Sequence, residues 1–224
     1  MDLALCAAGL VLGASFGWFA AGYQYLLYRE PEFREGRMAG RRLLAARILL
    51  AVAAGGTSAL ALRPDHYGLG PALLTALFSL SLVVLASTDF ERKRLPNRLM
   101  YPTIVLAAAF CWAWPDRDIE QVIAGAAVAV GTAVAMLAFG VLTGLLLRIR
   151  ATAFGLGDVK LIILLGLLCG WPAFFPALLY GVLAAGAVSV ALILQGRAKT
   201  VFSYGPYLIA GGLLVMLWWP RPFA

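Results

Sequence analysis

Long apolar segments separated by short polar ones make up most of the chain. Dividing the sequence at charged residues, proline and glycine predicts eight helices, most of them long enough to cross a bilayer. Their predicted ranges are 3–28, 43–62, 71–88, 98–114, 119–147, 158–171, 173–195 and 205–219. The sixth is short and ends at the Gly170-Trp171-Pro172 break. The pattern predicts an all-α polytopic membrane helical bundle that forms a single integral-membrane domain over residues 1–224.

The composition supports a membrane protein. Apolar residues make up 62% of the 224 residues and charged residues only 13%, whereas a water-soluble domain carries roughly 25% charged residues. We therefore expect the chain to be surrounded by the lipid bilayer. The first apolar segment follows Met1 and Asp2 without a basic stretch and continues to Tyr28, which predicts a retained span and not a cleaved signal peptide.

Basic residues predict how the helices are oriented. The segments between the predicted helices are numbered here as loops one to seven. The net charge is +7, and fifteen of the 18 lysines and arginines lie in or beside the first, third, fifth and seventh loops. Such clustering in short loops indicates membrane orientation and gives no reason to expect nucleic-acid binding. Because positively charged loops stay inside, the odd loops are predicted to be cytoplasmic and both termini to lie outside. A wrong number of spans would break this alternation.

Small residues are frequent in the predicted helices. The fifth helix carries a dense group of them: Ala124, Gly125, Ala126, Ala127 and Gly131. In lipid, small residues allow two helix backbones to approach closely, so we expect tight helix packing here.

The three cysteines do not indicate a metal site. Cys6, Cys111 and Cys169 are far apart and form no C-x-x-C pair, so neither zinc nor a redox motif is supported. No metal and no cofactor are expected. All three fall near outer span ends, where a disulfide is conceivable, although three free thiols packed as small apolar groups are favoured.

Two of the eleven acidic residues stand out as candidate catalytic groups. Asp89 ends an apolar run, and Asp158 begins another apolar helix after Gly155-Leu156-Gly157. A carboxylate at membrane depth is costly unless it is partnered or functional. The predicted topology places both at the cytoplasmic ends of their helices. The alternative is that Asp158 only caps its helix and that Asp89 pairs with Arg92 or Lys93.

Two carboxyls at the same depth can perform acid–base chemistry together. If they are brought close they share a proton, because both cannot be ionised comfortably. The charged member can then activate water while the protonated member polarises a carbonyl, as in aspartic proteases. Gly155 and Gly157 are expected to leave room for an extended substrate backbone and to adopt conformations closed to other residues.

Three sequence blocks resemble those of the type IV prepilin (leader) peptidases, membrane aspartic proteases of the G-x-G-D type. The first runs from Asp89 through a basic stretch to Pro96-Asn97, and the second from Gly155 to Lys160. The third contains Gly205-Pro206 and opens the last predicted helix. Gly13-Ala14-Ser15-Phe16 is more loosely similar to the family's opening. By this resemblance Asp89 and Asp158 are catalytic, and Pro96, Asn97, Gly155, Gly157, Lys160, Gly205 and Pro206 support the motif or bind substrate.

The resemblance implies a function as well as a site. The family cleaves prepilins, pseudopilins or related small pilins at the cytoplasmic face, between a short basic leader and the apolar helix that follows it. The expected location is the inner or plasma membrane of a prokaryote, with several membrane spans and the active site facing the cytoplasm. Lys160 is expected to orient Asp158 or contact substrate, or simply to extend toward the interface.

One departure from the family pattern limits the expected activity. Long members carry a cytoplasmic insertion with paired C-x-x-C zinc ligands and also methylate the new N-terminus. Here the loop from Arg29 to Arg42 is short, basic and free of cysteine. The chain therefore resembles the compact members, for which zinc is not expected and methyltransferase activity is in doubt.

Three alternatives stay open. A presenilin or signal-peptide-peptidase relative would carry Tyr-Asp at the first aspartate, where this chain has Thr88-Asp89, and Pro-Ala-Leu occurs both at 176–178 and at 71–73. A small ion- or proton-coupled transporter would favour carboxylates near mid-bilayer and paired broken helices. A catalytically inactive assembly scaffold would keep the same motifs.

Overall fold

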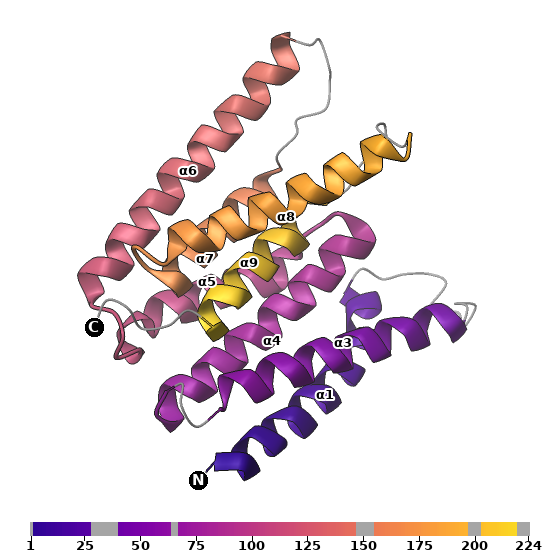
Figure 1. Cartoon of the computed structure of the whole chain (residues 1–224), viewed down its shortest axis with the longest axis vertical. Coiled ribbons are helices and arrows are strands. Elements are labelled where there is room, and N and C mark those ends of the chain that lie inside the picture. Colours follow the sequence, from indigo (N-terminus) through magenta and orange to yellow (C-terminus); the bar gives the residue numbers. More distant parts are fainter. Residues whose placement is uncertain (1, 28–39, 64–66, 147–154, 197–202, 219–224) are drawn as a thin grey trace. The chain divides into compact units, whose positions relative to one another are not determined.

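The computed structural model describes residues 2–27, 40–63, 67–146, 155–196 and 203–218. These residues form eight α-helices and one short 3-10 turn, with no strand among them (Figure 1). The helices are α1 (Asp2–Leu27), α3 (Gly40–Ala61), α4 (Leu69–Arg92), α5 (Asn97–Ala109), α6 (Ile119–Leu146), α7 (Leu156–Cys169), α8 (Phe174–Leu194) and α9 (Gly205–Trp218). The prediction of an all-helical polytopic bundle is confirmed, with one helix for each predicted span.

The helices differ in whether they can cross a bilayer. Five are long and apolar enough by length and composition, namely α1, α3, α4, α6 and α8. The other three, α5, α7 and α9, have 13, 14 and 14 residues. At 1.5 Å per residue each is about 20 Å long, which is less than the roughly 30 Å of a hydrocarbon core.

Two helix ends differ from the sequence prediction in ways that matter for the site. The third predicted helix was expected to end at residue 88, but α4 continues to Arg92, and Lys93 then takes a left-handed conformation with φ 54°. Charged residues do not by themselves end a helix, whereas a left-handed residue does. The predicted continuous helix 98–114 is also wrong. α5 ends at Ala109, and a 3-10 turn, Cys111–Ala113, precedes extended Trp114, the conformation favoured before Pro115.

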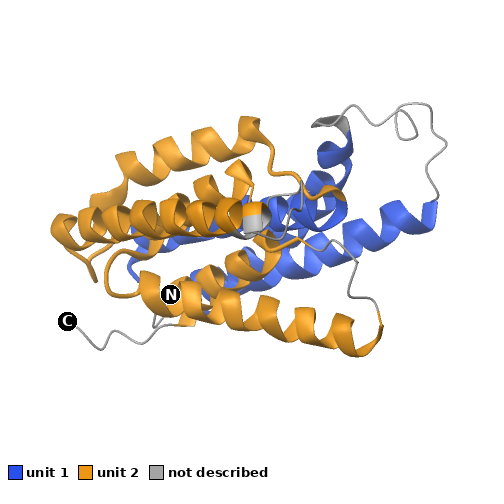
Figure 2. Ribbon diagram, turned by 90° about the horizontal axis from the view of Figure 1, so that it is seen from above, with its two compact units in different colours: residues 1–91 blue, residues 92–224 orange. Residues whose placement is uncertain are grey.

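The described chain divides into two compact units, residues 1–91 and 92–224 (Figure 2). The single domain predicted over 1–224 stays a prediction. In the first unit, α1 and α3 pack through glycine. A side chain at Gly13 would meet the Ala54 carbonyl oxygen at 2.5 Å, and one at Gly17 would meet the Leu50 backbone. Such contact between backbones is typical of helix pairs in lipid.

The second unit is built around α7, which contacts α5, α6, α8 and α9. Most of its apolar side chains are buried, including Leu161, Ile162, Leu164, Leu165 and Leu168, whereas Leu156 at its start is 68% exposed. The predicted close approach of the fifth helix is confirmed at Gly125, where an added Cβ would lie 2.7 Å from the Gly170 backbone. It is not needed at Gly131, which has nothing within 4 Å of that position.

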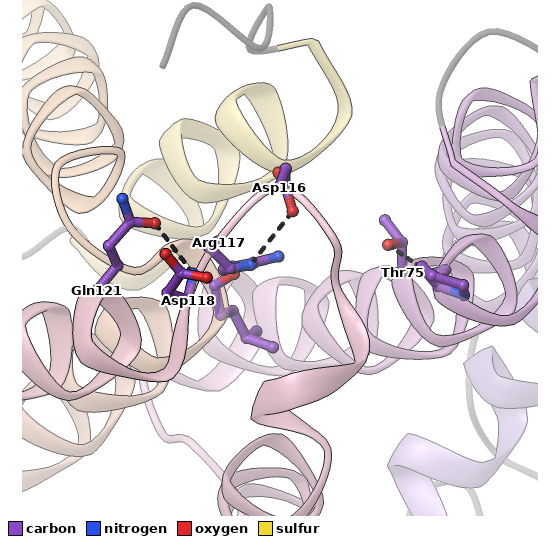
Figure 3. A network of polar contacts seen from close by, with 7 residues as sticks. Thr75, Asp116, Arg117, Asp118 and Gln121 are labelled. Carbon is purple, nitrogen blue, oxygen red and sulfur yellow. Dashed lines mark hydrogen bonds and ion pairs between the residues drawn. The ribbon is translucent and has the colours of Figure 1, made fainter. Parts of the chain in front are cut away.

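At the end of the second unit opposite the start of α7, Arg117 makes several contacts with neighbouring residues (Figure 3). Its guanidinium donates to the Leu168 carbonyl, lies 3.7 Å from Asp116 Oδ1 and sits 4.5 Å from the Trp114 ring centroid. Trp171 also donates its backbone N–H to the Gln121 carbonyl at 2.8 Å. The fourth and sixth loops therefore lie together, as the predicted alternation requires. Asp116 in the fourth loop is exposed and lies beside Arg117.

Several sequence predictions concern residues outside the described ranges. These include most of the first loop between Arg29 and Arg42, the arginines at 148 and 150, and Arg197 and Lys199. All three cysteines are described and are free thiols. Cys6 donates its thiol to the Ala59 carbonyl at 3.3 Å.

Candidate active site

Asp89 lies in the last turn of α4 and is only 4% exposed. The turns before it are apolar and buried, with Leu82 and Leu85 fully enclosed. Thr88 donates its hydroxyl to the Leu85 carbonyl at 2.9 Å, which keeps that polar group satisfied within the helix. A carboxyl buried to this degree costs several kcal/mol unless other groups stabilise it. Asp89 is therefore held in place by the fold and is not a solvated loop charge.

Polar side chains from three helices surround the end of α4 that carries Asp89. Ser87 Oγ donates to Gln24 Oε1 at 2.9 Å, and Tyr25 Oη donates to Glu91 Oε1 at 2.8 Å. Glu91 Oε2 is also 3.9 Å from Arg42 Nη2, and the Arg42 guanidinium lies 5.9 Å from the centroid of the Tyr25 ring. We call Gln24, Tyr25, Arg42, Ser87 and Glu91 the Gln24–Glu91 cluster.

The Gln24–Glu91 cluster gives the first unit a polar end. It joins the C-terminal end of α1, the N-terminal end of α3 and the C-terminal end of α4. The C-terminal ends of α1 and α4 and the N-terminal end of α3 therefore lie on the same side of this unit. This is the arrangement that the alternation of basic loops predicts.

Asp158 occupies the third position of α7. Its Oδ2 accepts a hydrogen bond from the Gly155 backbone N–H at 3.0 Å, while its own N–H donates to the Gly155 carbonyl at 3.0 Å. This is half of a capping box, because glycine has no side chain to complete the other half. A carboxylate at a helix N-terminus is also favoured by the helix dipole. Capping therefore occurs, and it orients the carboxyl group of Asp158.

The two motif glycines provide space, but neither needs an unusual backbone. Gly155 has φ −94° and ψ 161°, an extended conformation open to any residue, and Gly157 is helical without a positive φ. The expectation of a conformation closed to other residues is therefore wrong. The expected room is present at Gly157, where an added Cβ would lie 3.3 Å from Leu95 Cδ1. Glycine here lets the third loop come close to the start of α7.

Lys160 connects the first and second sequence blocks within the second unit. Its ammonium donates to Asn97 Oδ1 at 2.8 Å and lies 4.6 Å from the centroid of the Tyr101 ring. Asn97 begins α5, directly after the buried Pro96. The Pro-Asn and G-x-G-D blocks, 63 positions apart at these two side chains, therefore meet where α5 and α7 begin.

Gly205 and Pro206 open α9, as the sequence predicted. The Tyr204 carbonyl accepts the backbone N–H groups of Tyr207 and Leu208 at 3.1 and 3.2 Å, and Gly205 is buried. α9 packs on α8 and α7, and a side chain at Gly212 would meet Leu165 Cδ2 at 2.5 Å. All three sequence blocks thus mark a helix end or a helix start.

α6 extends well beyond the level of Asp158. Gly166 of α7 packs beside Gly125 and Ala129, in the first half of antiparallel α6. Counting 1.5 Å per residue along both helices puts Asp158 about 15 Å short of the C-terminal end of α6. The far part of α6 also projects past α7 in Figure 1. At the end where Asp158 lies, α6 is therefore longer than α7.

The two candidate catalytic residues belong to different compact units, Asp89 to the first and Asp158 to the second. Their pairing stays a prediction. Within the described residues there is no group of three or more histidine, cysteine, aspartate or glutamate side chains that could hold a metal ion.

Sequence reasoning missed the Gln24–Glu91 cluster. Gln24 is the single carboxamide in α1, and it is fully buried. A polar residue inside an otherwise apolar span is a recognisable signal for a functional or packing contact. Its partner Ser87 lies 63 positions away, so the contact itself could not be inferred from local pattern.

Comparisons with known proteins agree with the sequence blocks. A family model described as the type IV leader peptidase family matches residues 76–190. A curated relative from Escherichia coli, named prepilin leader peptidase/N-methyltransferase, is 29% identical over 139 residues, which cover 62% of this chain and 60% of the relative. A relative of the same name from Xanthomonas campestris pv. campestris is 30% identical over 145 residues, covering 63% and 48% respectively.

The chain spans less than two thirds of the length of these curated relatives. No solved structure matches it.

Proposed function

Because this chain belongs to the type IV leader peptidase family, we propose that it is a membrane-embedded aspartic endopeptidase that removes the basic leader from type IV prepilins or pilin-like proteins. The observation that carries the proposal is that the matched segment, 76–190, contains both Asp89 and Asp158. Each stands at the polar end of an apolar helix, one buried in α4 and one oriented at the start of α7.

The proposed chemistry uses the two carboxyls as one unit that shares a proton. The ionised member takes a proton from a water molecule, whose oxygen attacks the carbonyl carbon of the scissile peptide bond. The protonated member donates to the carbonyl oxygen as charge develops there. Collapse of the tetrahedral intermediate breaks the C–N bond, and a carboxyl proton passes to the departing amine. No metal or cofactor takes part in this scheme.

The proposed substrate is a pilin-like protein with a short basic leader and an apolar helix. The part of α6 that extends beyond Asp158 supports this choice, since an apolar substrate helix can pack along exposed apolar side chains. Phe139, Leu142 and Leu145, in the part of α6 beyond Asp158, are 63%, 54% and 73% exposed. The substrate's cleavage site would then lie at the polar end of that helix, level with the start of α7.

Cleavage by the purified chain is the direct test. Incubated with a pilin-like precursor in liposomes, the protein should release a leader ending immediately before the apolar helix, and the mature product should carry an unmodified N-terminus. The last expectation follows from the first loop, which lacks cysteine between Arg29 and Arg42. Mass spectrometry gives the cut position and the methylation state together. An uncut precursor would contradict the proposed activity. A product about 14 Da heavier, the net gain when a methyl group replaces a hydrogen, would contradict only the second expectation.

We propose that this site faces the cytoplasm of a prokaryotic cell. The support is that odd-numbered loops carry most basic residues, and that the third loop meets the start of α7 through Asn97 and Lys160. A cysteine introduced at Arg94 should be labelled in intact inverted vesicles, and one introduced at Trp112, at the opposite end of the unit, in intact right-side-out vesicles. A cysteine-free background is needed. Labelling of Arg94→Cys by a membrane-impermeant reagent from outside would contradict the orientation.

A further inference from the structure

Ser87 and Glu91 flank Asp89 in the last two turns of α4, and each is hydrogen-bonded to α1. They are four residues apart and so lie on the same helical face. Their partners are the consecutive residues Gln24 and Tyr25, at 2.9 and 2.8 Å. At about 100° per residue, Asp89 is turned by about 160° from either of them. The two hydrogen bonds therefore hold the face of α4 that is opposite to Asp89.

These bonds act on a part of the helix that would otherwise be weakly held. The last four carbonyl groups of a helix have no partner within it, and terminal turns fray. Here α4 ends abruptly, because Lys93 has the left-handed φ of 54° that side chains rarely adopt. Bonds at Ser87 and Glu91 fix both the rotation and the length of this last turn from α1.

Burial of the Gln24 side chain lowers the stability of the fold. Its side chain is fully buried, and among the described residues Nε2 makes no hydrogen bond of ordinary geometry, although the Gln24 side chain interacts with the neighbouring Tyr25 hydroxyl. A buried amide group left in this state costs about 1–3 kcal/mol, and replacing such a pair by apolar groups of similar size is often neutral or stabilising. Apolar residues in place of both Gln24 and Ser87 would thus serve packing at least as well.

We propose that Gln24 and Tyr25 are positioning residues for Asp89. Their hydrogen bonds to Ser87 and Glu91 fix the rotation of the last turn of α4, so that the Asp89 carboxyl points away from α1. The carboxyl is thereby held in the orientation needed for catalysis. The proposal rests on the proposed aspartic protease function. Its consequence is large because misplacing a catalytic group by about 1 Å can cost about a hundredfold in rate.

The test compares two tyrosines of the same helix. Tyr25→Phe removes the hydroxyl that binds Glu91, whereas Tyr23→Phe removes the hydroxyl of a side chain that is 59% exposed. In the full-length protein in liposomes, Tyr25→Phe should lower kcat for precursor cleavage about tenfold with KM within about twofold. Tyr23→Phe should leave both constants unchanged.

Gln24→Leu separates positioning from stability. It should lower kcat by a similar factor. When it is combined with Ser87→Ala, so that both partners of the bond are replaced by apolar groups, the thermal unfolding midpoint should stay the same or rise. Ser87→Ala should reproduce the loss, and the double variant should be no worse than either single variant, since the two residues act through one bond. A loss of kcat that follows a matching loss of thermal stability would overturn positioning in favour of a packing role.

The outcomes distinguish the two proposals. If Asp89→Asn cleaves as well as the unmodified protein, the aspartic mechanism fails. If Asp89→Asn is inactive but Tyr25→Phe and Gln24→Leu behave like Tyr23→Phe, only the positioning role is overturned. A rise in KM at constant kcat would also overturn it, because that result indicates substrate binding and not orientation of the carboxyl.

Discussion

Asp89→Asn and Asp158→Asn should each lower precursor cleavage by at least about a thousandfold, which is the scale expected when one member of a catalytic unit is lost. Asparagine keeps the size and most of the hydrogen-bonding capacity of aspartate but cannot take up and release the proton. At position 158 the amide oxygen can still accept the Gly155 N–H. The cap is therefore preserved while the proposed chemistry is removed.

The double variant and a surface control complete this experiment. If the carboxyls share one proton, Asp89→Asn/Asp158→Asn should be no less active than either single variant, because groups that act as a unit are not additive. Asp118→Asn is the matched control, since Asp118 is exposed in the fourth loop. Asp116 is less suitable because it contacts Arg117. Quantitative mass spectrometry of the precursor and product, normalised to the amount of membrane-inserted protein, provides the measurement.

Substantial cleavage by Asp158→Asn at normal protein levels would reduce Asp158 to a helix cap. Substantial cleavage by Asp89→Asn would make Asp89 a buried structural group. Either result would remove the paired-carboxylate mechanism, although not the family membership, which rests on the match over residues 76–190.

A second large effect is expected from one methyl group in the first unit. Gly17→Ala should destabilise the protein by about 1–3 kcal/mol, the usual range for overpacking. The added Cβ would collide with the Leu50 carbonyl oxygen and lie 2.8 Å from Ala51 Cα, and backbone atoms cannot move aside as a side chain can. The pair formed by α1 and α3 would have to separate.

Gly56→Ala is the matched control, in the partner helix α3. An added Cβ at Gly56 meets nothing within 4 Å, so the substitution should be neutral or stabilising by up to about 1 kcal/mol through helix propensity. Thermal unfolding in detergent, with cleavage as a second readout, measures both. Equal stability of the two alanine variants would contradict the close backbone contact between α1 and α3.

Two glycines of α6 show why the packing face of an apolar helix could not be predicted from the sequence pattern. The sequence predicts that the small residues of the fifth helix allow close packing, and both Gly125 and Gly131 fit that prediction equally well. Gly125 faces the Gly170 backbone at 2.7 Å from an added Cβ, while Gly131 faces open space. Which face of an apolar helix meets another backbone depends on the neighbouring helices, and an apolar sequence carries little information about its own orientation in lipid.

The positions of the helices along the chain could be predicted from neighbouring residues. Apolar runs bounded by charge, proline and glycine correspond to eight helices, because a chain in lipid must satisfy its backbone groups within each segment. The same local information identified Asp89 and Asp158, since a carboxyl beside an apolar run is conspicuous. It misplaced the end of α4, because Asp89, Glu91 and Arg92 are compatible with a helix and the actual stop is the left-handed Lys93.

The sequence by itself therefore determined the membrane class, the helices and the candidate aspartates, all of which depend on residues close together in the chain. Only the tertiary structure decided which distant residues meet beside those aspartates. Ser87 meets Gln24, Glu91 meets Tyr25, and Lys160 meets Asn97 across separations of 63, 66 and 63 positions. It also decided that the largely apolar α7 packs against four other helices. The physical reason is that apolar surface is equally at home against lipid and against protein, so the partners of a helix are set by packing and by a few buried polar bonds.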